Sequence, residues 1–223
     1  MHGKIGAPES AACFDISLGC SGFVYGLSIA SAFMQANGLK RGLLFTADPY
    51  SKIIDPDDKN TVLLFGDAAA VALLEDPVQP GAWQALRFAF GTRGSAGMAL
   101  NNRAGKLEMD GRAVFTFSAT AVPAQVKALL EETGLTVADI DLFLLHQGSK
   151  YIVDTIAQRL ALPRDKVVLG LAGCGNTVSS SIPLLLEKVM HERQLTRVLL
   201  SGFGVGLSWA SAILERAHAR GAR

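Results

Sequence analysis

The sequence is poor in charge, cysteine and histidine, and each shortage excludes a class of protein. Charged residues make up 18% of the 223 positions and nearly cancel to a net charge of +1, so we expect no nucleic-acid partner and no acidic membrane surface. The three cysteines, Cys13, Cys20 and Cys174, are an odd number without the spacing of a metal site, which fits the reducing cytoplasm. The four histidines are too scattered to suggest a metal site.

Long apolar runs and targeting signals are missing as well. No apolar run is long and uninterrupted enough to span a bilayer, and the first residues lack the charged, apolar and cleavage regions of a signal peptide. Hydrophobic residues nevertheless make up 49% of the chain, so it can bury a sizeable core as one large domain or two small ones. We therefore expect a globular, cytoplasmic protein with no membrane partner.

Short apolar segments alternate with longer helical patterns along the chain. Strands are expected over 11–17, 41–47, 68–74, 82–89, 142–145, 167–169, 198–200 and 208–214. Helices are expected over 20–38, 114–134, 151–162 and 177–192, with Pro123 either interrupting the second helix or starting it afresh. Residues 48–60 and 91–105 are expected to be irregular. This alternation predicts an α/β fold with buried, largely parallel sheets.

A faint internal repeat divides the chain. The order strand, turn, helix, strand, loop, strand runs from residue 11 to 75, and a matching order runs from 166 to 214. Two halves built on one plan would place Cys20 and Asn176 at equivalent strand-to-helix turns. The repeat is weak evidence on its own, because any α/β chain repeats its elements.

The segment 14–23 is the strongest candidate for chemistry. Its apolar run leads into a small-residue turn that holds Cys20, and a helical pattern follows at once. A thiol at a helix N-terminus lies among unpaired backbone N–H groups at the positive end of the macrodipole, and both favour the nucleophilic thiolate. The alternative is a small buried cysteine that packs under a helix, as most free cysteines do.

Three further stretches could supply hydrogen-bond donors. His146 directly follows the apolar strand 142–145, at the strand end that lines the crevice of an open α/β sheet. It could equally be a histidine at the edge of the core that is hydrogen-bonded to a backbone carbonyl. Asn176 stands before a predicted helix and could be only its N-cap. The glycine turn 202–206 could offer N–H groups to an oxyanion or be a tight hairpin turn.

Cysteine, histidine and asparagine in this chain order make chemical sense together. A thiolate can take an acyl group, while a neutral imidazole and a carboxamide can both donate hydrogen bonds to a developing enolate or oxyanion. Papain-like proteases have the same three residues in the same order. Those enzymes lack the buried parallel-strand pattern expected here, so a protease is disfavoured.

Five separated motifs in this order resemble one family, the 3-oxoacyl-[acyl-carrier-protein] synthase III enzymes of thiolase-like fold. They are the segment 14–23, the segments 55–58 and 65–69, His146-Gln147, the segment 175–183, and the closing stretch 204–209. The resemblance implies two pseudo-repeated α/β halves in an αβαβα layered arrangement, with the N-terminal half on residues 1–80 and the C-terminal half on 81–223. It also implies that the family's first strands and helices are absent, because Cys20 lies so near the start.

The resemblance further implies a reaction and a role for each residue. Acyl transfer from acyl-CoA to Cys20 would be followed by decarboxylative Claisen condensation with malonyl-acyl-carrier protein, assisted by His146 and Asn176. The enzyme would be a cytoplasmic homodimer that needs no metal or bound cofactor. The implied site is completed by the Cys20 and Val205 N–H groups as oxyanion hole, by Phe65 beside the nucleophile, and by the substrate-binding positions Lys59, Gly148 and Ser149.

Departures from the family pattern keep other functions open. After His146-Gln147 the family often has an Ala-Asn pair and a basic residue two positions on; here Gly148, Ser149, Lys150 and Tyr151 stand there. Lys59 stands where the family often has arginine, and a lysine keeps the charge but loses the bidentate fork of the guanidinium. Plant-type polyketide synthases also use Cys-His-Asn, but a proline would be expected there in place of Val205. The remaining alternatives are an acyltransferase acting on an alcohol or amine, and a catalytically inactive fragment.

Overall fold

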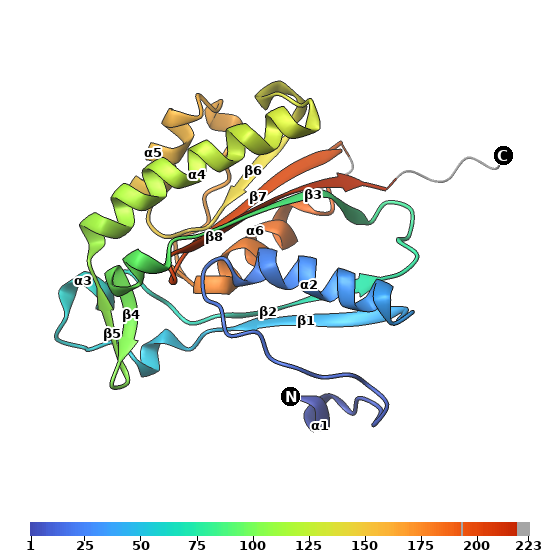
Figure 1. The fold of residues 1–223 in the computed structure, drawn as a ribbon, viewed down its shortest axis with the longest axis horizontal. Helices are drawn as coiled ribbons and strands as arrows, with labels where there is room; N and C mark the ends of the chain where they lie inside the picture. The colour runs from blue at the N-terminus through green and yellow to red at the C-terminus, as the bar shows by residue number, and fades with distance from the viewer. Residues whose placement is uncertain (193, 218–223) are drawn as a thin grey trace.

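The computed structural model describes residues 1–192 and 194–217, and their helices and strands are stacked in layers (Figure 1). The largest sheet has the strand order β3 (Trp83–Thr92), β8 (Ser208–Arg216), β7 (Arg197–Gly204) and β6 (Leu142–Leu145). A second sheet pairs β1 (Arg41–Ala47) with β2 (Ala69–Glu75), and the hairpin of β4 (Leu100–Arg103) and β5 (Lys106–Met109) stands apart.

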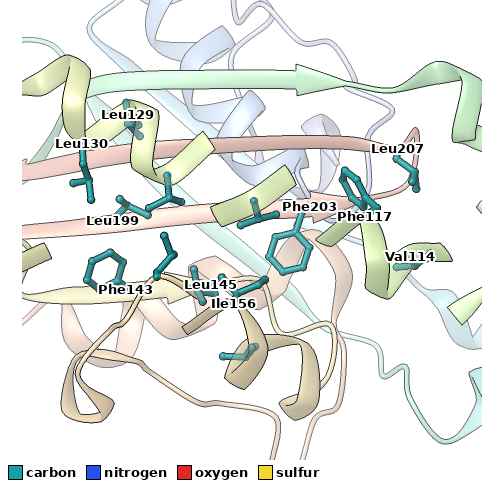
Figure 2. Packing of buried hydrophobic residues seen from close by; sticks show 14 of the residues in the cluster. Val114, Phe117, Leu129, Leu130, Phe143, Leu145, Ile156, Leu199, Phe203 and Leu207 are labelled. Carbon is teal, nitrogen blue, oxygen red and sulfur yellow. The ribbon is translucent and has the colours of Figure 1, made fainter. Parts of the chain in front are cut away.

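Helices cover both faces of the largest sheet. On one face lie α4 (Gly111–Thr133) and α5 (Lys150–Arg159); on the other, α2 (Gly22–Ala36) and α6 (Ser181–Val189) lie between this sheet and the β1–β2 sheet (Figure 1). Figure 2 shows the outer core, where apolar side chains of α4 and α5 meet those of β6 and β7. A second core, which we name the inner core, is formed by apolar side chains that pack around α2 and α6. These are four of the five expected layers.

The long helix α4 runs unbroken through Pro123. The Asp110 side chain accepts a hydrogen bond from the Ala113 N–H at 2.9 Å and caps the helix start. Gly134, in the left-handed conformation with φ of 68°, ends the helix. By length and composition α4 could cross a membrane, contrary to the expectation from apolar runs. Half of its most apolar stretch is buried against the sheet and α5, as in the core helix of a globular domain.

Three expectations about strands were wrong. Residues 11–17 form no strand and are largely exposed, since no strand lies beside them in the described part of the chain to supply hydrogen bonds. Residues 167–169 make only an isolated bridge, from Val167 to Phe143. Among the described strand pairs only β6–β7 is parallel, because the short turn between β7 and β8 forces those two strands to run antiparallel.

Two parts of the structure share one element order, and we name them the first unit (residues 20–75) and the second unit (residues 176–216). In the first unit α2 is followed by the antiparallel strands β1 and β2; in the second, α6 is followed by the antiparallel strands β7 and β8. Cys20 comes two residues before α2, and Asn176 comes just before the short helix η5 (Val178–Ser180) that leads into α6. The two helices lie together in the middle layer (Figure 1), so both turns point toward the same region.

The β1–β2 sheet has one covered and one open face. Leu44, Ala72 and Leu74 face the inner core beneath α2 and α6. The side chains that alternate with them on the other face are between 39% and 59% exposed, and we name this surface the open face: Leu43, Phe45, Val71 and Leu73. Leu43 pairs with Leu73 and Phe45 with Val71 across the two strands, so the open face is continuous.

Candidate active site

The Cys20 turn is buried at the junction of the two units. Cys20 is 3% exposed, and the Gly22 N–H closes the turn onto the Gly19 carbonyl at 2.6 Å. Next to it, the Ser21 and Ser208 hydroxyls lie 2.7 Å apart, which ties the start of α2 to the start of β8. The nucleophile candidate is therefore fixed by both units.

Two glycines allow other segments to approach this turn. A Cβ on Gly19 would lie 2.9 Å from Cγ1 of Val205 and 3.3 Å from Cγ1 of Val178. A Cβ on Gly204 would lie 2.8 Å from Sγ of Cys20. The closing glycine turn and the turn that follows Asn176 thus both pack directly against the Cys20 turn, at a distance that a side chain would prevent.

The thiol of Cys20 is not held as a thiolate. Burial raises its pKa from 9.0 to about 12, and the negative charge of Asp48 adds to the rise. Hydrogen bonds from the backbone N–H groups of Val205 and Cys20 lower the pKa, but by less than burial raises it. The expectation of a thiolate at the helix N-terminus is therefore wrong for the free protein, because loss of hydration disfavours the charged form. The same two N–H groups nonetheless face the sulfur.

His146 directly follows β6 and is 2% exposed. Its backbone N–H donates to the Ser201 carbonyl at 2.8 Å, and its ring packs edge-on against Phe203 with centroids 5.3 Å apart. Its Nδ1 lies 2.7 Å from the Ser181 hydroxyl. Burial lowers the pKa of His146 to about 3, against a smaller opposite effect of the Val178 carbonyl, so the ring is neutral at physiological pH.

Asn176 is held by its own turn in a defined orientation. Its Oδ1 accepts a hydrogen bond from the Val178 N–H at 2.9 Å, as in an Asx turn. Its backbone N–H donates to the Leu64 carbonyl at 2.9 Å, and its carbonyl accepts from the Gly66 N–H at 3.0 Å. Because the amide oxygen is already used, the Nδ2 group is the part of the side chain left to donate to a bound molecule. The bridge to residues 64–66 also places Phe65 beside Asn176.

The loop after β1 contributes two residues that the sequence analysis did not select. The Tyr50 ring lies 5.0 Å from the Phe65 ring, and its hydroxyl would be 3.3 Å from a Cβ on Gly19. Burial raises the pKa of Tyr50, and electrostatic interactions with Cys20, in its ionised form, and with Asp48 raise it further. The Asp48 carboxylate accepts hydrogen bonds from the N–H and hydroxyl of Ser179. Asp48 directly follows the predicted strand 41–47, which was a signal available from the sequence, whereas Tyr50 lies further into the loop.

The remaining predicted residues lie in different settings. Gly148 is buried against the His146 ring, with 3.6 Å between its Cβ position and Cδ2 of the ring. The Ser149 hydroxyl caps α5 by accepting from the Ile152 N–H at 3.2 Å, so it has a structural task. Lys59 is exposed on the short helix α3 (Lys59–Val62).

The arrangement combines a thiol, two backbone N–H groups facing it, and two neutral side chains with N–H groups to donate. Such a site can hold an acyl group on sulfur and can stabilise negative charge on a thioester oxygen. Together with the layered fold, these features define the class of thiolase-fold acyl-transferring condensing enzymes.

Comparison with known proteins gives the family. The family model described as 3-oxoacyl-[acyl-carrier-protein] synthase III matches residues 14–94, and the model of its C-terminal part matches residues 130–216. Beta-ketoacyl-[acyl-carrier-protein] synthase III of Streptococcus equi subsp. equi is 36% identical to this chain, and the match covers 96% of this chain and 71% of that protein. Beta-ketoacyl-[acyl-carrier-protein] synthase III 2 of Streptomyces coelicolor is 39% identical, and the match covers 92% of this chain and 63% of that protein.

Solved structures agree with this assignment. A 3-oxoacyl-(acyl-carrier protein) synthase from Burkholderia xenovorans has a TM-score of 0.88 at 33% identity, covering 97% of this chain and 67% of that one. The synthase III of Pseudomonas aeruginosa has a TM-score of 0.86 at 33% identity, and the match covers 98% of this chain and 70% of that one. The chain belongs to the 3-oxoacyl-[acyl-carrier-protein] synthase III family, whose members are condensing enzymes that transfer acyl groups.

Proposed function

We propose that Cys20 is the acyl-accepting nucleophile of this condensing enzyme, and that His146 and Asn176 assist the second half of its reaction. The substrates would be an acyl-CoA and a malonyl-acyl-carrier protein. The observation that supports this most is the convergence at Gly19, where the Val205 and Val178 segments both pack against the Cys20 turn. Every group that the reaction needs is carried by one of these segments or, for His146, by the end of β6.

In the first half-reaction the Cys20 sulfur attacks the thioester carbonyl of the acyl-CoA. The carbonyl oxygen becomes an oxyanion, which the N–H groups of Val205 and Cys20 can stabilise, since both already face the sulfur. When the carbon–sulfur bond to coenzyme A breaks, the leaving thiolate takes up the proton that the Cys20 thiol gives up. The products are an acyl thioester on Cys20 and free coenzyme A.

In the second half-reaction the malonyl thioester loses its carboxylate as carbon dioxide. The electron pair left behind forms an enolate, whose oxygen would accept hydrogen bonds from Nδ2 of Asn176 and from a ring N–H of His146. The carbanion carbon attacks the acyl carbonyl on Cys20, and the carbon–sulfur bond breaks. The released thiolate takes up one proton from solvent, which its pKa of about 12 favours, and the resting thiol is restored.

The surroundings of Cys20 suggest how substrates are held. Phe65 and Tyr50 form an aromatic wall beside the nucleophile, suited to an apolar acyl group. Gly148, packed flat against the His146 ring, would leave room for the thioester arm, while the exposed Lys59 could meet a phosphate of coenzyme A and Ser149 could contact the arm through its backbone. We further propose that the enzyme uses no metal or bound cofactor, since the proposed steps need none. We also propose that it is a cytoplasmic homodimer.

The test is to trap the intermediate. After incubation with acyl-CoA, intact-protein mass spectrometry should show an adduct of one acyl group, which Cys20→Ala loses and Cys174→Ala keeps. Addition of malonyl-acyl-carrier protein should then release carbon dioxide and remove the adduct. Absence of the adduct on folded protein would reject the proposal. Acyl transfer to an added alcohol or amine without release of carbon dioxide would indicate simple acyl transfer instead.

A further inference from the structure

The Ser181 hydroxyl is a buried polar group to which the proposed reaction assigns no task. Ser181 is the first residue of α6 and is 3% exposed. Its Oγ lies 2.7 Å from Nδ1 of His146 and 3.5 Å from the backbone nitrogen of Gln147. The hydroxyl therefore occupies Nδ1 of His146, and Nε2 is the ring nitrogen left to meet a substrate.

A hydrogen bond of 2.7 Å between a hydroxyl and an imidazole nitrogen can form in two ways. Either the Ser181 O–H donates to Nδ1, or an Nδ1–H donates to the Ser181 oxygen. A neutral imidazole carries one proton, so the first arrangement places it on Nε2 and the second leaves Nε2 bare. Only the first gives His146 an N–H to offer to a substrate from Nε2.

The surroundings of Ser181 favour the first arrangement. The Gln147 N–H already points to the hydroxyl oxygen as a donor. Within residues 1–192 and 194–217, no carbonyl or carboxylate oxygen accepts the Ser181 proton, whereas Ser118 and Thr133 of α4 each donate to the carbonyl four residues earlier. Since a buried hydroxyl proton needs an acceptor, Nδ1 of His146 is the one that Ser181 has.

We propose that Ser181 is a positioning residue that donates its hydroxyl proton to Nδ1 of His146 and so keeps the ring proton on Nε2. From there the ring can donate to the malonyl thioester oxygen during condensation. The proposal rests on the proposed function for its consequence, but the position of the ring proton can be measured without any activity. It assigns the role of Ser181 to the second half-reaction alone, because acyl transfer to Cys20 uses backbone N–H groups.

The first experiment determines the tautomer by NMR. With ¹⁵N-labelled histidine, long-range ¹H–¹⁵N spectra distinguish a ring protonated on Nε2 from one protonated on Nδ1, and the signals that His146→Gln removes identify the residue. We expect Nε2–H in the wild-type protein and a shift toward Nδ1–H in Ser181→Ala. A wild-type ring protonated on Nδ1 overturns the proposal.

The second experiment compares the two half-reactions. A histidine in the wrong tautomer can cost up to about 10⁴-fold in rate, so Ser181→Ala should slow condensation by about 10²- to 10⁴-fold. Acyl-adduct formation on Cys20 should stay within about threefold of the wild type. Ser181→Thr, which keeps the hydroxyl, should recover the Nε2–H signal and most of the rate.

The neighbouring Ser180 provides the matched control. It is buried in the same turn, but its hydroxyl contacts Thr46 at 2.8 Å and the Ala68 carbonyl at 3.2 Å instead of His146. Ser180→Ala should leave the tautomer and the ratio of the two half-reactions unchanged. An equal loss of condensation in Ser180→Ala, or a normal tautomer in Ser181→Ala, overturns the proposal. If the wild-type protein forms no acyl adduct, the proposed function fails while the NMR result still decides the role of Ser181.

Discussion

The first and second units share one element order but differ in how their sheets are buried. In the second unit, β7 is buried from Val198 to Gly204 and β8 from Ala210 to Leu214, with helices on both faces. In the first unit, β1 and β2 alternate between residues packed under the helices and the exposed residues of the open face. The same backbone plan therefore serves a central sheet in one unit and a sheet with a single covered face in the other.

The difference shows that the active-site turns do not depend on equal burial of the two sheets. Cys20 in the first unit and Asn176 in the second are both nearly inaccessible, at 3% and 4% exposure. Both turns are held from across the unit boundary, by Ser208 for the Cys20 turn and by Leu64 and Gly66 for Asn176. Each unit thus helps to fix the chemical group carried by the other.

The largest effects should come from the two functional turns, and they should differ in kind. Cys20→Ala should abolish both half-reactions, because the sulfur takes part in each, with a loss of at least about 10³-fold. Asn176→Ala should slow condensation by about 10²- to 10³-fold, as for loss of one oxyanion donor, while the acyl adduct still forms. Mass spectrometry and carbon dioxide release measure the two steps separately. An Asn176→Ala protein that cannot be acylated would contradict the division of roles.

How much of this site the sequence could predict depends on the range of the interaction. The apolar run 142–145 and the small-residue turn at Cys20 are local patterns, and they located β6, His146 and the start of α2 correctly. Ser181 and Asp48 act through contacts with residues 35 and 131 positions away, which no local pattern reports. The expected strand over 11–17 shows the opposite error: its local pattern is apolar, but a strand also needs a neighbouring backbone to bond.

Truncating one leucine in each sheet should lower the free energy of unfolding by amounts that differ by several kcal/mol. Leu200 in β7 is fully buried, and Leu200→Ala should lower the free energy of unfolding by about 2–5 kcal/mol through lost burial and a cavity. Leu73 in β2 is 59% exposed, so Leu73→Ala should change it by about 0.5 kcal/mol or less. Urea unfolding of both variants gives the comparison. Equal losses would mean that Leu73 is covered in solution.

The two buried titratable groups should affect stability at opposite ends of the pH range. The pKa of His146 is lowered from 6.5 to about 3, so its contribution to the free energy of unfolding is fully present above pH 6.5. Between pH 6.5 and 3 the ring is protonated in the unfolded chain but not in the folded protein, so this contribution is lost as the pH falls. The pKa of Cys20 is raised from 9.0 to about 12, so stability declines as the pH rises from 9 toward 12.

Urea unfolding at a series of pH values measures both effects. His146→Gln should flatten the acid side of the profile, and Cys20→Ser should flatten the alkaline side. The exposed His191 provides a control, because His191→Gln should leave the acid slope as it is. An acid slope that persists in His146→Gln would show that other groups cause it.

The smallest change in stability is expected on the open face, and it tests the comparison within one strand. Val71 and Ala72 are neighbours in β2, but Val71 is 56% exposed on the open face while Ala72 packs against the inner core. Val71→Lys should alter the free energy of unfolding by about 0.5 kcal/mol or less, and it should reduce the binding of a hydrophobic dye.

Ala72→Lys is the matched substitution on the covered face. It would place an ammonium group under α2 and α6 without a partner of opposite charge, so we expect a loss of more than about 2 kcal/mol. Urea unfolding and dye binding, measured on both variants at equal concentration, decide the matter. If Val71→Lys is as costly as Ala72→Lys, then both faces of the first unit's sheet are covered in solution, and the two units are buried alike after all.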